Sequence, residues 1–172
     1  LGQPSRDVAV RQRIGYLPDS PVFAHYLTAR QFLKLCAKLL KIPRDLQRQR
    51  IEEVLEIVAM TESADELLKG FSRGMIQRIG VAQALLNKPE LLILDEPLVG
   101  LDPEGRRDLL DILRQQQAAG VCFFFCSHIL SDVEKLCDRV GILARGKLLA
   151  SGPLTELAGN RGLRVHIPAD HA

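Results

Sequence analysis

The stretch Leu91-Leu92-Ile93-Leu94-Asp95-Glu96-Pro97 joins an apolar run directly to two carboxylates and a proline. Four large apolar residues in a row are typical of a fully buried strand in a parallel sheet. Ligands of open α/β sheets bind at the carboxyl ends of such strands, where Asp95 and Glu96 are expected to lie. One carboxylate there suits magnesium, and the other suits a water molecule that must be oriented or deprotonated. The alternative interpretation is a strand followed by an acidic helix cap.

Composition and charge limit the class of protein. Of the 172 residues, 47% are hydrophobic and 26% are charged, as in a soluble globular domain. The net charge of +2 gives no global nucleic-acid signature, so no nucleic-acid partner is expected. No apolar run is long enough to cross a bilayer, and a membrane role would have to pass through a partner. The chain begins Leu1-Gly2-Gln3-Pro4 without methionine or signal peptide, which predicts a truncated N-terminus.

The four cysteines form neither a C-x-x-C pair nor a zinc-binding pattern. Cys122 and Cys126 lie in the apolar run 121–126, where the expected role is that of a small buried hydrophobic residue. A reducing cytoplasm is the simplest environment for such a chain.

Apolar periodicity predicts a helical segment that leads into alternating strands and helices. A strand at 13–17 precedes helices at 28–40, 43–60 and 75–86. The later elements are predicted as strand 91–95, helix 103–118, strand 121–126, helix 130–137, strands 139–144 and 147–151, helix 153–158 and strand 163–167. This order favours an α/β fold with a parallel sheet and an inserted helical subdomain.

A polar turn at Phe71–Met75 opens directly into the third predicted helix. Free N–H groups at a helix N-terminus attract anions, and Ser72 adds a hydroxyl donor. Gly74 lets a phosphate approach the backbone closely, and Arg73 adds positive charge. An ordinary N-cap has the same pattern, so both interpretations stay open at this point.

Two further polar groups follow strand ends or begin helices. Asp102 precedes Pro103 in the pattern of a helix N-cap with proline at the first helical position. His128 follows the strand at 121–126, which in a parallel sheet places it on the same edge as Glu96. A purely structural histidine is the alternative.

The stretch Gly141–Leu148 matches most of the phosphate-binding-loop pattern, but we do not expect it to form such a loop. It reads G-x-x-x-x-G-K but ends in Leu148, so the hydroxyl that binds magnesium is missing. Alternating residues on both sides of Arg145-Gly146 predict a β-hairpin turn instead.

Basic residues recur at helical spacing along one predicted helix, at Arg30, Lys34, Lys38 and Lys41. A solvated helix face explains them, and so does proximity to anionic lipid headgroups or to an acidic partner.

In order and spacing, these motifs resemble the ATP-binding subunit of an ATP-binding-cassette (ABC) transporter over about residues 10–159. The matching motifs are the start of the Q-loop (Tyr16–Asp19), the signature motif (Phe71–Met75), the Walker B strand (Leu91–Glu96), the D-loop (Val99–Asp102) and the switch histidine (His128). The resemblance implies a partial P-loop NTPase core of RecA-like fold, with a parallel sheet, an inserted helical subdomain and a small C-terminal β-hairpin.

The resemblance also implies a division into domains. Residues 1–159 would form a partial ATP-binding domain, with 1–21 and 88–159 in its α/β core. Residues 22–87 would form the helical subdomain that carries the signature motif, and its insert, about Val22 to Gly70, would be where the transmembrane permease docks. Residues 160–172 would begin a C-terminal extension.

The cofactors implied are ATP and Mg²⁺. Asp95 would hold magnesium through water, and Asp19 would contact the same ion or its water. Glu96 would act as general base or water-positioning group, and His128 would contact the γ-phosphate.

The remaining matches imply a partner, because these proteins resemble head-to-tail pairs that close around two ATP molecules. Ser72 and Gly74, with Arg73 between them, would bind the ATP of a second ATP-binding subunit, identical or different. Asp102 would link the two sites. The location implied is the cytoplasmic face of the cell membrane, through the permease.

The chain departs from the family pattern at three places. Asp19 stands where most members have glutamine, and Arg73 and Met75 replace glycine and glutamine of the signature motif. The acidic residue and the Phe-Ser-x-Gly-Met signature look most like the bacterial exporter branch. The Walker A phosphate loop, its lysine and the adenine-stacking aromatic residue are expected upstream of Leu1, so the 172-residue chain alone is predicted to be inactive. The alternatives are a soluble ABC protein of translation or DNA repair, and a non-catalytic module that completes a partner's site.

Overall fold

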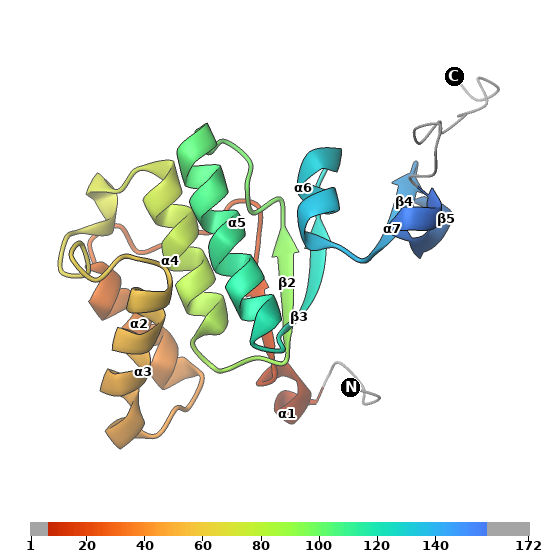
Figure 1. The fold of residues 1–172 in the computed structure, drawn as a ribbon. Coiled ribbons are helices and arrows are strands. Elements are labelled where there is room, and N and C mark those ends of the chain that lie inside the picture. The colour runs from red at the N-terminus through yellow and green to blue at the C-terminus, as the bar shows by residue number, and fades with distance from the viewer. Residues whose placement is uncertain (1–6, 158–172) are drawn as a thin grey trace. The chain divides into compact units, whose positions relative to one another are not determined.

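The computed structural model describes residues 7–157. They belong to two compact units, one that ends at His128 and one that begins at Ile129 (Figure 1). None of the helices in residues 7–157 is long and apolar enough to cross a membrane.

The first unit contains a three-stranded parallel sheet in the order β1-β2-β3. Strand β1 is Ile14–Leu17, β2 is Leu91–Asp95 and β3 is Cys122–Cys126. Leu17 pairs with Leu94 and Asp95 pairs with Cys126, so the three strands end at one edge of the sheet. This edge is the one on which the sequence places its candidate residues.

Helix α1 (Val8–Arg11) precedes β1. Between β1 and β2 lie α2 (Ala29–Leu39), α3 (Arg44–Ile57) and α4 (Arg73–Leu85), with a 3-10 turn at Leu68–Gly70 before α4. Helix α5 (Pro103–Ala118) lies between β2 and β3. Helix α4 packs on β1 and also contacts α2 and α3. Gly15 allows this close approach, because a Cβ there would lie 2.2 Å from the Ala84 carbonyl oxygen.

Local sequence sets the helix boundaries. Thr28 caps α2 through a capping box with Gln31, and Ser72 and Asp102 cap α4 and α5. The predicted bounds of strand 91–95 and helix 103–118 are confirmed. The second predicted helix ends at Ile57 rather than Met60, and the third begins at Arg73 rather than Met75.

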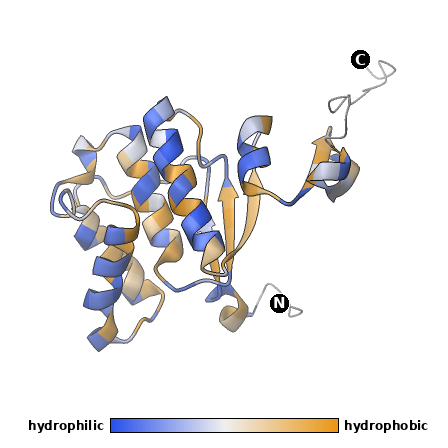
Figure 2. Cartoon of the chain, in the orientation of Figure 1, coloured by the Kyte–Doolittle hydropathy of each residue, from blue (hydrophilic) through white to orange (hydrophobic). Residues whose placement is uncertain are grey.

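The sheet is covered by the described helices on one face only. Leu92 and Leu94 are fully buried, whereas Ile93 between them is half-buried. Tyr16 and Phe124, which flank Ile93 on the neighbouring strands, are 52% and 60% exposed. Figure 2 shows β2 and β3 as apolar along their length. The prediction of a fully buried strand is therefore wrong for alternate residues of β2.

The cysteine prediction fails for the same reason. Cys122 and Cys126 point to the same face of the sheet as Phe124, and both are exposed. They are small apolar residues of an uncovered sheet face rather than core residues.

The second unit contains α6 (Leu130–Leu136), the antiparallel strands β4 (Arg139–Ala144) and β5 (Lys147–Pro153), and α7 (Leu154–Leu157). The turn between the strands consists of Arg145 and Gly146, with φ angles of 49° and 74°. Two residues of positive φ form the turn type that suits a twisted hairpin. The hairpin prediction is thus confirmed, whereas the predicted strand 163–167 lies outside the described residues.

Candidate functional site

Glu96 and His128 come together at the carboxyl edge of the sheet. Glu96 directly follows β2, and its backbone N–H donates to the Cys126 carbonyl oxygen at 3.0 Å. One carboxylate oxygen, Oε1, accepts from the His128 backbone N–H at 3.1 Å and lies 2.8 Å from His128 Nδ1. A φ of +46° turns Glu96 out of the strand direction. Residues other than glycine adopt this backbone conformation at some cost in free energy. The two strand ends therefore hold this pair in a defined orientation.

The second oxygen of Glu96, Oε2, is buried and has no hydrogen-bond partner among the described residues. A buried carboxylate oxygen without a donor is unfavourable, so it marks a place for a water molecule or a cation. The Glu96 side chain is 24% exposed, whereas that of His128 is 68% exposed. The histidine ring is thus largely exposed to solvent, whereas the carboxylate is mostly buried.

Asp95 is the last residue of β2 and lies half-buried beside Cys126. The pKa of the Cys126 thiol is raised, first by partial desolvation and then by the negative charges of Asp95 and Glu96. A thiol with a raised pKa is a poor nucleophile at neutral pH, so Cys126 is not suited to be a reactive group.

Asp19 lies two residues beyond β1 and is exposed. Its carboxylate accepts a hydrogen bond from the Ser20 hydroxyl at 3.2 Å and forms no hydrogen bond with the described residues Asp95 and Glu96. Within residues 7–157, no three His, Cys, Asp or Glu side chains converge as a ready metal site. Carboxylate oxygens suit Mg²⁺, which commonly takes one or two of them and completes its shell with water and substrate phosphate. The donor set at this edge therefore fits magnesium.

A second cluster forms where α4 and α5 begin. Ser72 caps α4 by accepting from the Met75 N–H at 3.3 Å, and Asp102 caps α5 by accepting from the Gly105 N–H at 3.1 Å. The N-cap interpretation of both residues is thus confirmed, whatever else they do. Gly74 is half-buried, and a Cβ on it would lie 3.7 Å from the Leu101 side chain.

Arg73 joins the two parts of this second cluster. A Cβ on Gly100 would lie 2.3 Å from Arg73 Cζ, so the guanidinium rests against the bare glycine backbone. Gly100 also has a φ of +72°, which favours glycine for a second reason. The signature segment and the loop after β2 are therefore in direct contact within one chain.

The structure does not bring the two clusters together directly. No hydrogen bond or ion pair joins Ser72, Arg73, Gly74 or Asp102 to Asp95, Glu96 or His128, all of them described residues. Among the described residues, the two clusters are linked through Gln77, a residue that was not among the predicted site residues.

Gln77 lies in the second turn of α4 and is 2% exposed. Its side-chain amide donates to the carbonyl oxygen of Pro97, the residue after Glu96, at 3.2 Å. The sequence contained a signal for this role, because helical spacing places Gln77 on the same face as the buried Val81 and Leu85. A glutamine on an apolar face needs a specific partner.

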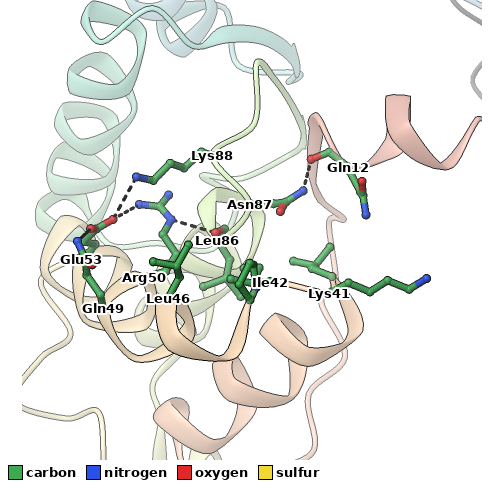
Figure 3. A pocket seen from close by; sticks show the side chains of 12 residues that line it. Gln12, Lys41, Ile42, Leu46, Gln49, Arg50, Glu53, Leu86, Asn87 and Lys88 are labelled. Atoms are coloured by element: carbon green, nitrogen blue, oxygen red, sulfur yellow. Dashed lines mark hydrogen bonds and ion pairs between the residues drawn. The ribbon is translucent and has the colours of Figure 1, made fainter.

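Two arginines fix the remainder of α4. Arg78 donates to the Val58 carbonyl oxygen at 3.2 Å and to Asp108 at 2.7 Å. Arg50 of α3 donates to the carbonyl oxygens of Leu85 and Leu86 at 2.5 and 2.9 Å, where α4 ends. Figure 3 shows Arg50 in a pocket of about 370 Å³, paired with Glu53. This arginine holds the pKa of Glu53 below its usual value.

Known proteins are similar to this chain over most of its length. The family model described as ABC transporter matches residues 2–99. An uncharacterized ABC transporter ATP-binding protein of Nostoc is 49% identical over 163 residues, which cover 94% of this chain and 49% of that protein. The bacitracin transport ATP-binding protein BcrA of Bacillus licheniformis is 43% identical over 149 residues, or 86% of this chain and 48% of that protein.

Solved structures give the same result. One described as the ATP-binding subunit of an ABC transporter superposes with a TM-score of 0.75 at 30% identity, covering 88% of this chain and 63% of that one. The chain spans about half the length of the curated relatives it matches. Together with the parallel sheet and its helices, these matches show that the chain belongs to the ABC transporter family and carries part of its ATP-binding domain.

Proposed function

We propose that this chain is part of the ATP-hydrolysing subunit that powers a membrane exporter. The observation that carries the proposal is the Glu96–His128 pair, in which one carboxylate oxygen is held and the other is buried without a partner. The similarity to a protein named for bacitracin transport supports an exporter.

Each group at the sheet edge has a defined task in this proposal. His128 and the backbone of residue 128 hold Glu96 Oε1, which leaves Oε2 to accept a proton from, or orient, the attacking water. The exposed ring of His128 is then available to the γ-phosphate. Asp95 would hold Mg²⁺ through water, and Asp19 would contact the same ion or its water. Bound magnesium would neutralise the charge that develops on the phosphate oxygens.

The second cluster serves a second subunit in the proposal. Ser72, Arg73 and Gly74 at the N-terminus of α4 bind the γ-phosphate of ATP held by an identical or different ATP-binding subunit, and Asp102 links the two sites. Free helical N–H groups, a hydroxyl and a guanidinium are suited to phosphate oxygens.

The domain division and location follow the family resemblance. We place the α/β core at 1–21 and 88–159, the helical subdomain at 22–87 and the start of an extension at 160–172. The permease would dock on the insert from about Val22 to Gly70. The assembled protein would lie on the cytoplasmic face of the membrane through its permease. The 172-residue sequence holds no complete phosphate-loop pattern, so we expect no ATP turnover by this chain alone.

The test is Glu96→Gln in the complete protein that contains this chain. Removing the base is expected to lower ATP turnover by about 10²-fold or more while ATP binding persists, with the two subunits trapped in the closed dimer. Phosphate release and ATP-dependent dimerisation on size exclusion measure these outcomes. Turnover at the parental rate would show that Glu96 is not the base.

A further inference from the structure

A hollow on the surface of the helical segment is lined by positive side chains. It lies between α2, α3 and the turn that joins them, has a volume of about 620 Å³, and is lined by Lys34, Lys38, Ile42, Arg44 and Gln47. None of these described lining residues is acidic. Asp45, next to Arg44, is exposed and does not line the hollow.

The frame of the hollow is fixed by a buried polar contact. Gln47 is 9% exposed, and its side-chain amide donates to the Ile42 carbonyl oxygen at 2.8 Å. This bond ties the first turns of α3 to the residue at which the chain leaves α2. Lys34 and Lys38 lie one helical turn apart on α2, opposite Arg44 at the start of α3. The three cations are therefore presented by two helices of fixed relative position.

Two other cations of these helices, Arg30 of α2 and Arg50 of α3, are neutralised within the chain. Arg30, at the start of the same basic stripe, is ion-paired with Glu52 and with Asp65. In the neighbouring pocket, Arg50 and Lys88 share Glu53 (Figure 3). Arg30 is therefore a paired, partly exposed member of this series of basic residues.

By contrast, Lys34, Lys38 and Arg44 form no ion pair or side-chain hydrogen bond with any residue in 7–157. Like charges one turn apart on a helix repel one another, and so do like charges that face one hollow. An anionic ligand would relieve this repulsion. Ammonium and guanidinium groups are suited to phosphate oxygens in particular.

We propose that this hollow binds the phosphate groups of anionic phospholipid headgroups. Leu35 and Leu39, each next to one of the lysines, are 44% and 74% exposed on α2. Cations beside exposed leucines are the composition of helices that lie at a membrane surface. The choice of lipid over soluble phosphate also rests on the proposed function, which places the protein at a membrane.

The test uses the 172-residue chain and lipid vesicles, without ATP or permease. One set of vesicles is phosphatidylcholine alone and the other contains about 30% phosphatidylglycerol, a range in which cytoplasmic basic segments respond to surface charge. The variant Lys34→Gln/Lys38→Gln/Arg44→Gln removes the cations of the hollow. The control Arg11→Gln/Lys69→Gln/Arg107→Gln removes the same charge from exposed positions elsewhere in the first unit.

We expect the parental chain to co-sediment with the anionic vesicles only, and less strongly as salt rises from about 0.1 to 0.5 M. The hollow variant should bind roughly 100-fold more weakly, since each cation near an anionic surface contributes about fivefold. The control should stay within about threefold of the parental chain. Circular dichroism verifies the folding of each variant, and the single variant Lys38→Gln should lose about fivefold if the triple variant does not fold.

Equal loss in the control and hollow variants would show that net charge, not the hollow, determines binding. The proposal would also be overturned if the hollow variant bound anionic vesicles as tightly as the parental chain. Full displacement of the chain from vesicles by inorganic pyrophosphate, at unchanged ionic strength, would identify a soluble phosphate as the ligand instead. Because the vesicle test contains no ATP, its failure would not bear on the Glu96→Gln test. Failure of the Glu96→Gln test would likewise not change the result with vesicles.

Discussion

At the scale of single residues, Gly100 is a position where two independent requirements coincide. Its φ of +72° favours glycine, and the guanidinium of Arg73 occupies the space a Cβ would need. Gly100→Ala is therefore expected to lower the free energy of unfolding by about 1 to 3 kcal/mol, measured by urea denaturation. Arg73 is expected to be displaced from the loop after β2.

A matched control separates the two causes. Gly120 has a φ of +94°, and a Cβ there would meet no described atom within 4 Å. Gly120→Ala thus measures the backbone cost alone, expected to be about 1 kcal/mol. In an Arg73→Ala background, the loss in free energy of unfolding caused by Gly100→Ala should fall to a similar value. If this loss is the same with and without Arg73, the guanidinium contact contributes nothing to it.

At the scale of elements, helix α4 is held near its beginning by Gln77. Replacing Gln77 with leucine keeps the side-chain volume similar but leaves the buried Pro97 carbonyl oxygen without a donor. We expect a loss of about 1 to 3 kcal/mol in the free energy of unfolding. Gln83→Leu, on the same helix but without a side-chain hydrogen bond among the described residues, should change stability by about 0.5 kcal/mol or less. A stability equal to that of the parental chain for Gln77→Leu would mean the hydrogen bond is not stabilising.

The end of α4 is held by Arg50, and this contact should make stability depend on pH. Because Arg50 depresses the folded-state pKa of Glu53, the folded chain binds that proton less readily than the unfolded chain. The stabilisation is present above the usual glutamate pKa of about 4.3 and is lost as pH falls through the lower folded value. Arg50→Met should flatten the acid limb of the stability curve. Unfolding in urea between about pH 3 and 7 measures this. An unchanged acid limb in the variant would rule out the Arg50–Glu53 contact as its cause.

At the scale of the whole molecule, the sequence predicted local elements better than their surroundings. The boundaries of β2 and α5 follow from signals a few residues apart, namely an apolar run that meets charge and an Asp-Pro cap. The exposure of Cys122 and Cys126 depends instead on which face of the sheet the helices cover, which periodicity does not reveal. Parallel pairing was enough to predict that Glu96 and His128 share an edge. The contact of Arg73 with Gly100 was not predictable, because it depends on the path of two loops.

The hydrogen bond from Gln77 to Pro97 has a consequence for timing in an assembled pair of subunits. On the proposed function, the first turn of α4 senses the neighbour's nucleotide, while the residue before Pro97 acts on the subunit's own. One helical turn lies between the two groups, so nucleotide at one site would change the binding free energy at the other site, and the change would be equal in both directions. A subunit built in this way would bind its own nucleotide with an affinity that depends on whether its neighbour's site is occupied.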